Sequence, residues 1–148
     1  MVPALTILHV LAALSWVGGI FFAYMALRPA SLQLEPPLRL ALWRGVLGRF
    51  FPWVWAFVLV LLASGHALMA LGAAPASRPV IGMAGLGWVM ALLFAYLYFV
   101  PFKSLRRAVA VADTAAAAAA MARIRPVVAT NLVLGLTVSA LGASARFW

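Results

Sequence analysis

Four long apolar stretches alternate along the chain with segments that carry the charged residues. The stretches cover residues 4–27, 50–71, 80–101 and 126–145, and none contains Lys, Arg, Asp or Glu. About 20 helical residues cross the hydrocarbon core of a bilayer, where a helix satisfies all its backbone groups internally. The stretches are apolar on all sides, whereas strands of a membrane barrel alternate. The pattern predicts an all-α integral membrane protein, with four transmembrane helices in one domain over residues 1–148.

The first stretch differs from a secretory signal peptide. It has no basic residue before it, and its apolar run exceeds the roughly 7–15 residues of a signal sequence. We therefore expect it to be a retained first span.

The composition agrees with a membrane protein and excludes several chemistries. Of 148 residues, 68% are hydrophobic, 9% are charged and none is cysteine, whereas a soluble domain has about 25% charged residues. Disulfides, thiolate metal sites and cysteine nucleophiles are excluded. Glu35 and Asp113 are the only acidic residues, which leaves little for paired-carboxylate catalysis. The net charge of +9 indicates arginines beside anionic lipid rather than nucleic acid as a partner.

The basic residues predict how the spans point. Nine of the eleven lie in segments 28–49 and 102–125. The positive-inside rule places these two segments in the cytoplasm and both termini outside. We therefore expect an antiparallel four-helix bundle with both segments as cytoplasmic loops.

Local signals suggest some structure within the loops and the last span. Residues 36–49 are expected to form a short interfacial helix. Asp113 is a candidate N-cap for a cytoplasmic helix over the alanine run 115–120. Gly135 is expected at a close contact between helices, and Asn131 is expected to form a hydrogen bond between helices.

The two histidines of the chain both lie inside spans. His9 is five residues after the outer end of the first span, and His66 is five residues before the outer end of the second. At 1.5 Å per residue, each lies about 8 Å below the outer boundary. A titratable residue inside a membrane helix suggests a functional site. Each histidine could instead only hydrogen-bond a carbonyl or hydroxyl, but their matched depth favours a shared ligand between spans one and two.

One candidate ligand is haem b, with the two histidines as axial ligands. Trp16 shares the face of the first histidine and would line the porphyrin, and Gly19 would admit a flat ligand. Arg78 and Arg146 would meet the propionates at the outer surface. The protein would then be a haem-dependent membrane oxidoreductase that passes electrons between quinone and an outer acceptor.

The other candidate ligand is copper. Met69 and Met83 are expected near the depth of the histidines, and thioether sulfur suits Cu(I). Methionine also fills irregular gaps in cores, so neither residue is by itself evidence of a metal. The imidazole pair does not separate haem from copper, and no catalytic residue is assigned.

Six short motifs along the chain are distinctive: residues 8–19 (LHVLAALSWVGG), 49–55 (RFFPWVW), 64–66 (SGH), 106–109 (RRAV), 123–125 (RIR) and 131–135 (NLVLG). Together they resemble the copper-resistance protein D (CopD) family of bacterial inner-membrane proteins. The resemblance implies a small four-span member with a role in copper handling or transport, and with a periplasmic copper partner.

The first span also resembles HemJ-type protoporphyrinogen oxidase, a four-span family associated with haem b. His9, Trp16 and Arg28 match its pattern, and the resemblance implies porphyrinogen oxidation. That family has a histidine in its third span, where this chain has residues 82–85 (GMAG). Copper handling is therefore the first functional hypothesis and haem redox chemistry the second. A structural or assembly subunit without cofactor is a third hypothesis, and a homo-oligomer is left open.

Overall fold

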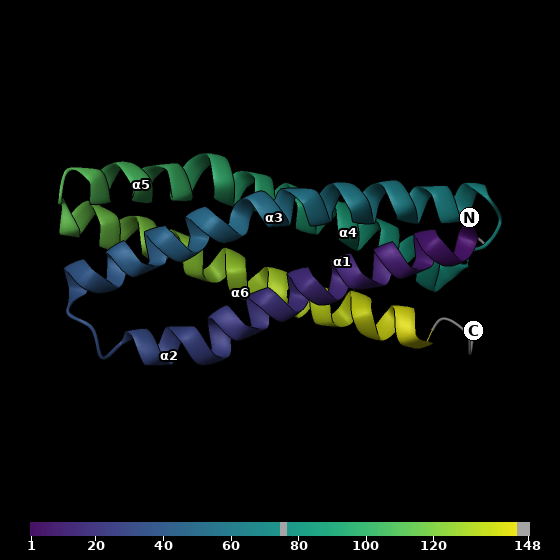
Figure 1. Ribbon diagram of the computed structural model, residues 1–148, viewed down its shortest axis with the longest axis horizontal. Helices are drawn as coiled ribbons and strands as arrows, with labels where there is room; N and C mark the ends of the chain where they lie inside the picture. The colour runs from purple at the N-terminus through teal and green to yellow at the C-terminus, as the bar shows by residue number, and fades with distance from the viewer. Residues whose placement is uncertain (75–76, 145–148) are drawn as a thin grey trace.

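The computed structural model describes residues 1–74 and 77–144, and within these ranges the chain is helical with no strand. Four rods, Val2–Ser31, Pro36–Ala70, Arg78–Ala110 and Thr114–Ser144, are long and apolar enough to cross a membrane. The predicted all-α architecture with four spans is confirmed (Figure 1).

Two of the rods are made of several elements, because each contains a short π-helix. The first rod is formed by α1, η1 and α2, and the third by α4, η2 and α5. The elements in chain order are α1 Val2–Phe22, η1 Ala23–Leu27, α2 Arg28–Ser31, α3 Pro36–Ala70, α4 Arg78–Leu97, η2 Tyr98–Phe102, α5 Lys103–Ala110 and α6 Thr114–Ser144.

The helices continue well beyond the apolar stretches. The expected interfacial helix over 36–49 is the first part of α3, which begins with two prolines and runs without a break into the span. Proline suits the first helical turn, where its missing N–H leaves no bond unmade. The expected N-cap is confirmed, since the N–H of Ala116 donates to Asp113 Oδ1 at 2.9 Å. The helix that follows does not end with the alanine run but passes through Pro126 and continues to Ser144 as α6.

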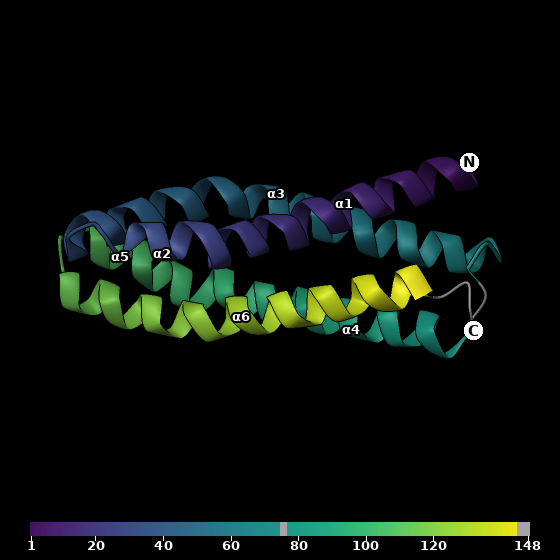
Figure 2. The same cartoon turned by 90° about the horizontal axis from the view of Figure 1, so that it is seen from below.

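The helices form two layers. Figure 2 shows α1 and α3 in one layer and α4 and α6 in the other, and the contacts within each pair are the most extensive. The N-terminus, the α3–α4 connection and the end of α6 lie at one end of the bundle, and α2 and α5 lie at the other (Figure 1). Segments 28–49 and 102–125, which carry nine of the eleven basic residues, therefore meet at the α2–α5 end. The side of the membrane that this end faces stays a prediction.

The outer faces of the bundle are strongly apolar. Leu14, Leu59, Leu92 and Val133, one from each rod, are 64–66% exposed. Water would solvate such a surface poorly, whereas lipid chains match it.

The interior is packed with aromatic rings from the middle of the bundle toward the α2–α5 end. Phe51 meets Phe94 with ring centroids 5.3 Å apart and Phe102 at 4.7 Å, both edge to face. Trp55 meets Phe94 in the same way at 5.0 Å. Such pairs contribute beyond the area that they bury, so this part of the core is tightly filled.

Helices α1 and α3 approach closely at Gly19, where a Cβ atom would overlap the Phe50 ring. Gly19→Val should displace this ring and destabilise the bundle by about 1–3 kcal/mol, the usual cost of overpacking. The measurement is the melting temperature of purified protein in one detergent.

Gly18→Val is the matched control, because a Cβ at Gly18 meets nothing within 4 Å. The packing described for this contact would be refuted if the two variants melted at the same temperature.

Candidate metal centre

A cavity of about 200 Å³ lies between the two layers, toward the end of the bundle that carries the N-terminus. Its helical lining comes from residues 9–17 of α1, 58–69 of α3, 80–90 of α4 and 135–139 of α6. Cores are normally close-packed, and space opens here because many lining residues have little side chain. These small residues are Ala13, Gly65, Ala74, Ala84, Gly87 and Gly135.

His9 reaches the cavity from α1 while its ring lies against α3. Its Nδ1 is 2.8 Å from Ser64 Oγ, and the same hydroxyl donates to the carbonyl of Val60. Because the hydroxyl proton is used in that second bond, Ser64 accepts from Nδ1–H, and the lone pair of His9 is on Nε2. Gly65 makes the approach possible, since a Cβ there would lie only 3.2 Å from His9 Cε1.

His66 reaches the same cavity from α3, and its ring is also oriented by a hydrogen bond. Its Nδ1 is 2.7 Å from the carbonyl oxygen of Leu62. A carbonyl only accepts, so Nδ1 carries the proton and Nε2 carries the lone pair. Trp88 packs edge to face on the imidazole, with ring centroids 6.0 Å apart.

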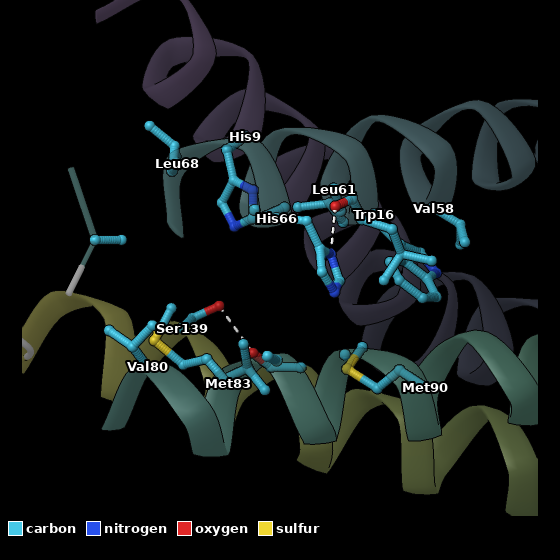
Figure 3. A pocket seen from close by; sticks show the side chains of 18 of the residues that line it. His9, Trp16, Val58, Leu61, His66, Leu68, Val80, Met83, Met90 and Ser139 are labelled. Atoms are coloured by element: carbon cyan, nitrogen blue, oxygen red, sulfur yellow. Dashed lines mark hydrogen bonds between the residues drawn. The ribbon is translucent and has the colours of Figure 1, made fainter. Parts of the chain in front are cut away.

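The two imidazoles therefore present the same chemistry to one space. Figure 3 shows both rings pointing from the α1–α3 layer toward α4 and α6. Metal-bound histidines usually donate their other ring N–H to a carbonyl, hydroxyl or carboxylate, which fixes the tautomer and the ring orientation. His9 and His66 both have this partner already, with Nε2 left to accept a ligand.

Methionine sulfur completes the donors around the cavity. Met69 lines it from α3, and Met83 and Met90 line it from the α4 side opposite the histidines (Figure 3). Met83 packs on Gly142 of α6, where a Cβ would lie 3.4 Å from its Cε. The space around the histidines thus holds two nitrogen donors and three thioethers.

Some lining and orienting residues were not predicted. Met90 is seven residues after Met83 and so shares its helix face, a spacing that could have identified it. Ser139 lines the cavity but donates to the Gly135 carbonyl of its own helix. Ser64, which orients His9, lies on another helix, and no spacing within the first span points to it.

The residues expected to surround a haem are not all brought together. Trp16 does line the cavity and is buried, with Phe94 edge to face at 6.3 Å. Gly19 is absent from the lining and is covered by Phe50 instead. Arg78 is the exposed first residue of α4 and does not line the cavity. Arg146 lies outside the described residues.

Asn131 does not form the helix-to-helix hydrogen bond that was expected. It is 3% exposed, and its Oδ1 has no hydrogen-bond partner among the described residues. The expectation assumed that a buried amide in a span finds a polar group across the interface. No described residue on the facing helices supplies a donor to this oxygen.

Within residues 1–74 and 77–144, no group of three or more His, Cys, Asp or Glu side chains could hold a metal ion. A metal in the cavity would therefore depend on the two imidazoles together with methionine sulfur. Oxygen-ligated ions such as Ca²⁺ and Mg²⁺ have no suitable ligands there.

Taken together, the helices and their lipid-facing surfaces define a multi-pass membrane protein. The sequence pattern of a family described as Copper resistance protein D (CopD) matches residues 44–145, more than two thirds of the chain. The chain belongs to the CopD family, so its relation to copper resistance is established at the level of the family. The matched region contains His66, Met69 and Met83, and His9 precedes it.

The other two comparisons gave no further relatives. No curated protein matches the chain, and no solved structure matches it. The resemblance of the first span to HemJ-type protoporphyrinogen oxidase stays a prediction.

The hydrogen bonds predict that both histidines carry a proton on Nδ1. Nitrogen-15 chemical shifts of histidine-labelled protein in detergent measure this tautomer directly. Ser64→Ala removes the acceptor of His9 Nδ1, so the His9 signal should change tautomer or broaden, while the His66 signal serves as the internal reference. A proton on Nε2 of either residue in the wild-type protein would contradict the assignment.

Proposed function

We propose that this CopD-family protein handles copper by binding one Cu(I) ion in the cavity, with Nε2 of His9 and Nε2 of His66 as ligands. The observation that carries the proposal is that two spans direct imidazoles with free Nε2 lone pairs into one space. Imidazole and thioether together are donors that suit copper, and thioether selects the cuprous state. Membership of the family supports copper as the metal, and the orientation of the two imidazoles supports a site between them.

The absence of carboxylates from the lining favours the monovalent ion. Neither Glu35 nor Asp113 lines the cavity. Removing an ion from water costs several kcal/mol in a real protein, and this cost rises with the square of the charge. A cavity of neutral nitrogen and sulfur donors therefore accepts Cu(I) at much lower cost than Cu²⁺ or Zn²⁺.

The methionines would complete the coordination from two directions. Met69 follows His66 by three residues on α3 and so lies on a neighbouring part of the same helix face. Met83 approaches from α4, across the cavity from the imidazoles (Figure 3). A ligand set drawn from both layers would hold the two halves of the bundle together when copper is bound.

Copper fits this arrangement better than haem. Two axial histidines need a flat slot between them that is wide enough for the porphyrin. The ring of His9 instead lies directly against α3, next to Gly65, and both imidazoles point toward the same layer (Figure 3). The residues expected at the porphyrin face and propionates, Gly19 and Arg78, do not line the cavity.

The proposed role includes exchange of copper with a partner outside the membrane. The cavity lies at the end of the bundle that the positive-inside rule places outside. A copper-carrying protein of the periplasm could therefore load or unload the ion without its crossing the bilayer.

The test of the site is Cu(I) affinity, measured by competition with a chromophoric Cu(I) chelator in detergent. Wild-type protein should bind one equivalent. His66→Ala should lose binding, and Ser64→Ala should weaken it by about 10–100-fold, the usual cost of removing a partner that orients a ligand.

A visible spectrum of the same protein, expressed with ample haem supply, separates copper from haem. We expect no Soret band. A Soret band that disappears in His66→Ala would overturn the copper assignment, as would unchanged Cu(I) affinity in that variant.

The contribution of sulfur is tested by Met83→Leu, which keeps an apolar side chain of similar size. Cu(I) affinity should fall by about tenfold or more if the thioether is a ligand. The loss of a ligand should lower the affinity at least as much as the loss of a residue that orients a ligand, which lowers it by about 10–100-fold. Met25→Leu is the control, because Met25 is exposed on η1 and does not line the cavity. Equal affinities in the two variants would exclude Met83 from the ligand set.

A further inference from the structure

A second hollow, of about 470 Å³, lies toward the opposite end of the bundle. It is formed between the first half of α3 and the η2–α5 segment, and three arginines line it: Arg44, Arg49 and Arg106. No residue of this groove lines the cavity between the histidines. We refer to it as the arginine groove.

The arginines of this groove have no counter-charge within it. The chain has eleven basic residues and two acidic ones, and neither Glu35 nor Asp113 lines the groove. Asp113 is already used in capping α6. Three guanidinium groups that share one hollow repel one another, so the groove would be stabilised by an anion.

The α3 side of the groove stays open because glycines line it. Gly45 and Gly48 both line it, and a Cβ at Gly48 would come no closer than 3.9 Å to Phe102 Cζ. Arg49 is held along α3, because its Nη1 donates to the Gly45 carbonyl at 3.3 Å. From the other wall, the guanidinium of Arg106 lies over the Phe102 ring, 5.9 Å from the centroid.

The groove also straddles the boundary between charged and apolar sequence. Arg49 directly precedes the apolar stretch 50–71, and Lys103 is the second residue after the stretch 80–101. Pro52, Tyr98 and Phe102 continue the groove on the apolar side of this boundary. A ligand that fills it would be anionic at one end and apolar at the other.

We propose that the arginine groove binds the phosphate group of an anionic membrane phospholipid. Guanidinium groups pair with phosphate through charge-assisted, bidentate hydrogen bonds. Basic hollows between membrane helices on the cytoplasmic side are suited to anionic head groups, and the positive-inside rule predicts that this end is cytoplasmic. The apolar wall would receive the first part of the acyl chains, which inorganic phosphate lacks. The proposal does not depend on the copper site.

The experiment titrates the detergent-purified protein with phosphatidylglycerol and counts bound lipid by native mass spectrometry. One arginine near a lipid surface accounts for about fivefold in affinity. The triple variant Arg44→Gln, Arg49→Gln, Arg106→Gln should therefore bind phosphatidylglycerol about 100-fold more weakly. Phosphatidylcholine, which has no net charge, should bind no better to the wild type than to this variant.

The matched control is the triple variant Arg39→Gln, Arg107→Gln, Arg123→Gln, which removes the same charge from residues that do not line the groove. It should keep wild-type affinity. Equal weakening of the two triple variants would overturn the proposal, because attraction would then be a property of the net charge. Circular dichroism checks that both variants keep their helix content.

Gly48→Leu provides a variant with unchanged charge. A leucine there fills the floor of the groove and replaces a glycine by a better helix former, so the fold should persist while phosphatidylglycerol binding weakens. Unchanged binding would overturn the proposal. Finally, inorganic phosphate is added at millimolar concentration to the protein with phosphatidylglycerol bound. If phosphate does not displace the lipid, the result supports a phospholipid site. Full displacement would overturn the lipid assignment in favour of free phosphate.

Discussion

Hydrogen bonding without water is the constraint on which the structure of this bundle depends. In a lipid interior a polar group is costly unless it finds a partner in the protein, and among the described residues Asn131 Oδ1 is the one buried polar side-chain atom without a partner. The hydroxyls of Ser64, Thr137 and Ser139 all donate to a carbonyl four residues earlier on their own helix. The histidines obey the same rule on one ring nitrogen only, through Ser64 and the Leu62 carbonyl. What remains unused is one Nε2 on each ring, so a general requirement of membrane helices also orients the candidate metal ligands.

The existence and number of the helices follow from hydropathy, but their lengths do not. A helix that extends beyond the membrane needs no apolar residues, so the pattern of charged and apolar residues does not predict where the helix ends. The arginines at 39, 44 and 49 spread around the helix and give residues 36–49 no amphipathic face. The segment is helical nevertheless, because Pro36 and Pro37 suit the first turn of a helix and neither Gly45 nor Gly48 interrupts it before the apolar run. The same continuity joins the alanine run to the last span.

The meeting of two histidines could be predicted from the helical rise alone, whereas the surroundings of the histidines could not. At about 100° per residue, Trp16 lies seven positions from His9 and returns to nearly the same face, and it does line the cavity. Gly19 lies ten positions from His9, about a quarter turn away by the same arithmetic, and it packs on Phe50 instead. Contacts that join two helices, such as His9 with Ser64, depend on how α1 and α3 are rotated relative to each other. One span gives no information about that rotation.

The aromatic packing of Phe51, Phe94 and Phe102 has a consequence for how the histidine cavity would exchange its contents. These rings are buried between the cavity and the α2–α5 end of the bundle, where nine of the eleven basic residues gather. The packed rings therefore close the cavity on the side of the α2–α5 end, and a strongly positive region lies beyond them. A cation that entered would leave by the route by which it came. Its occupancy would follow the supply on one side of the membrane, as in a reversible store, rather than the gradient across it.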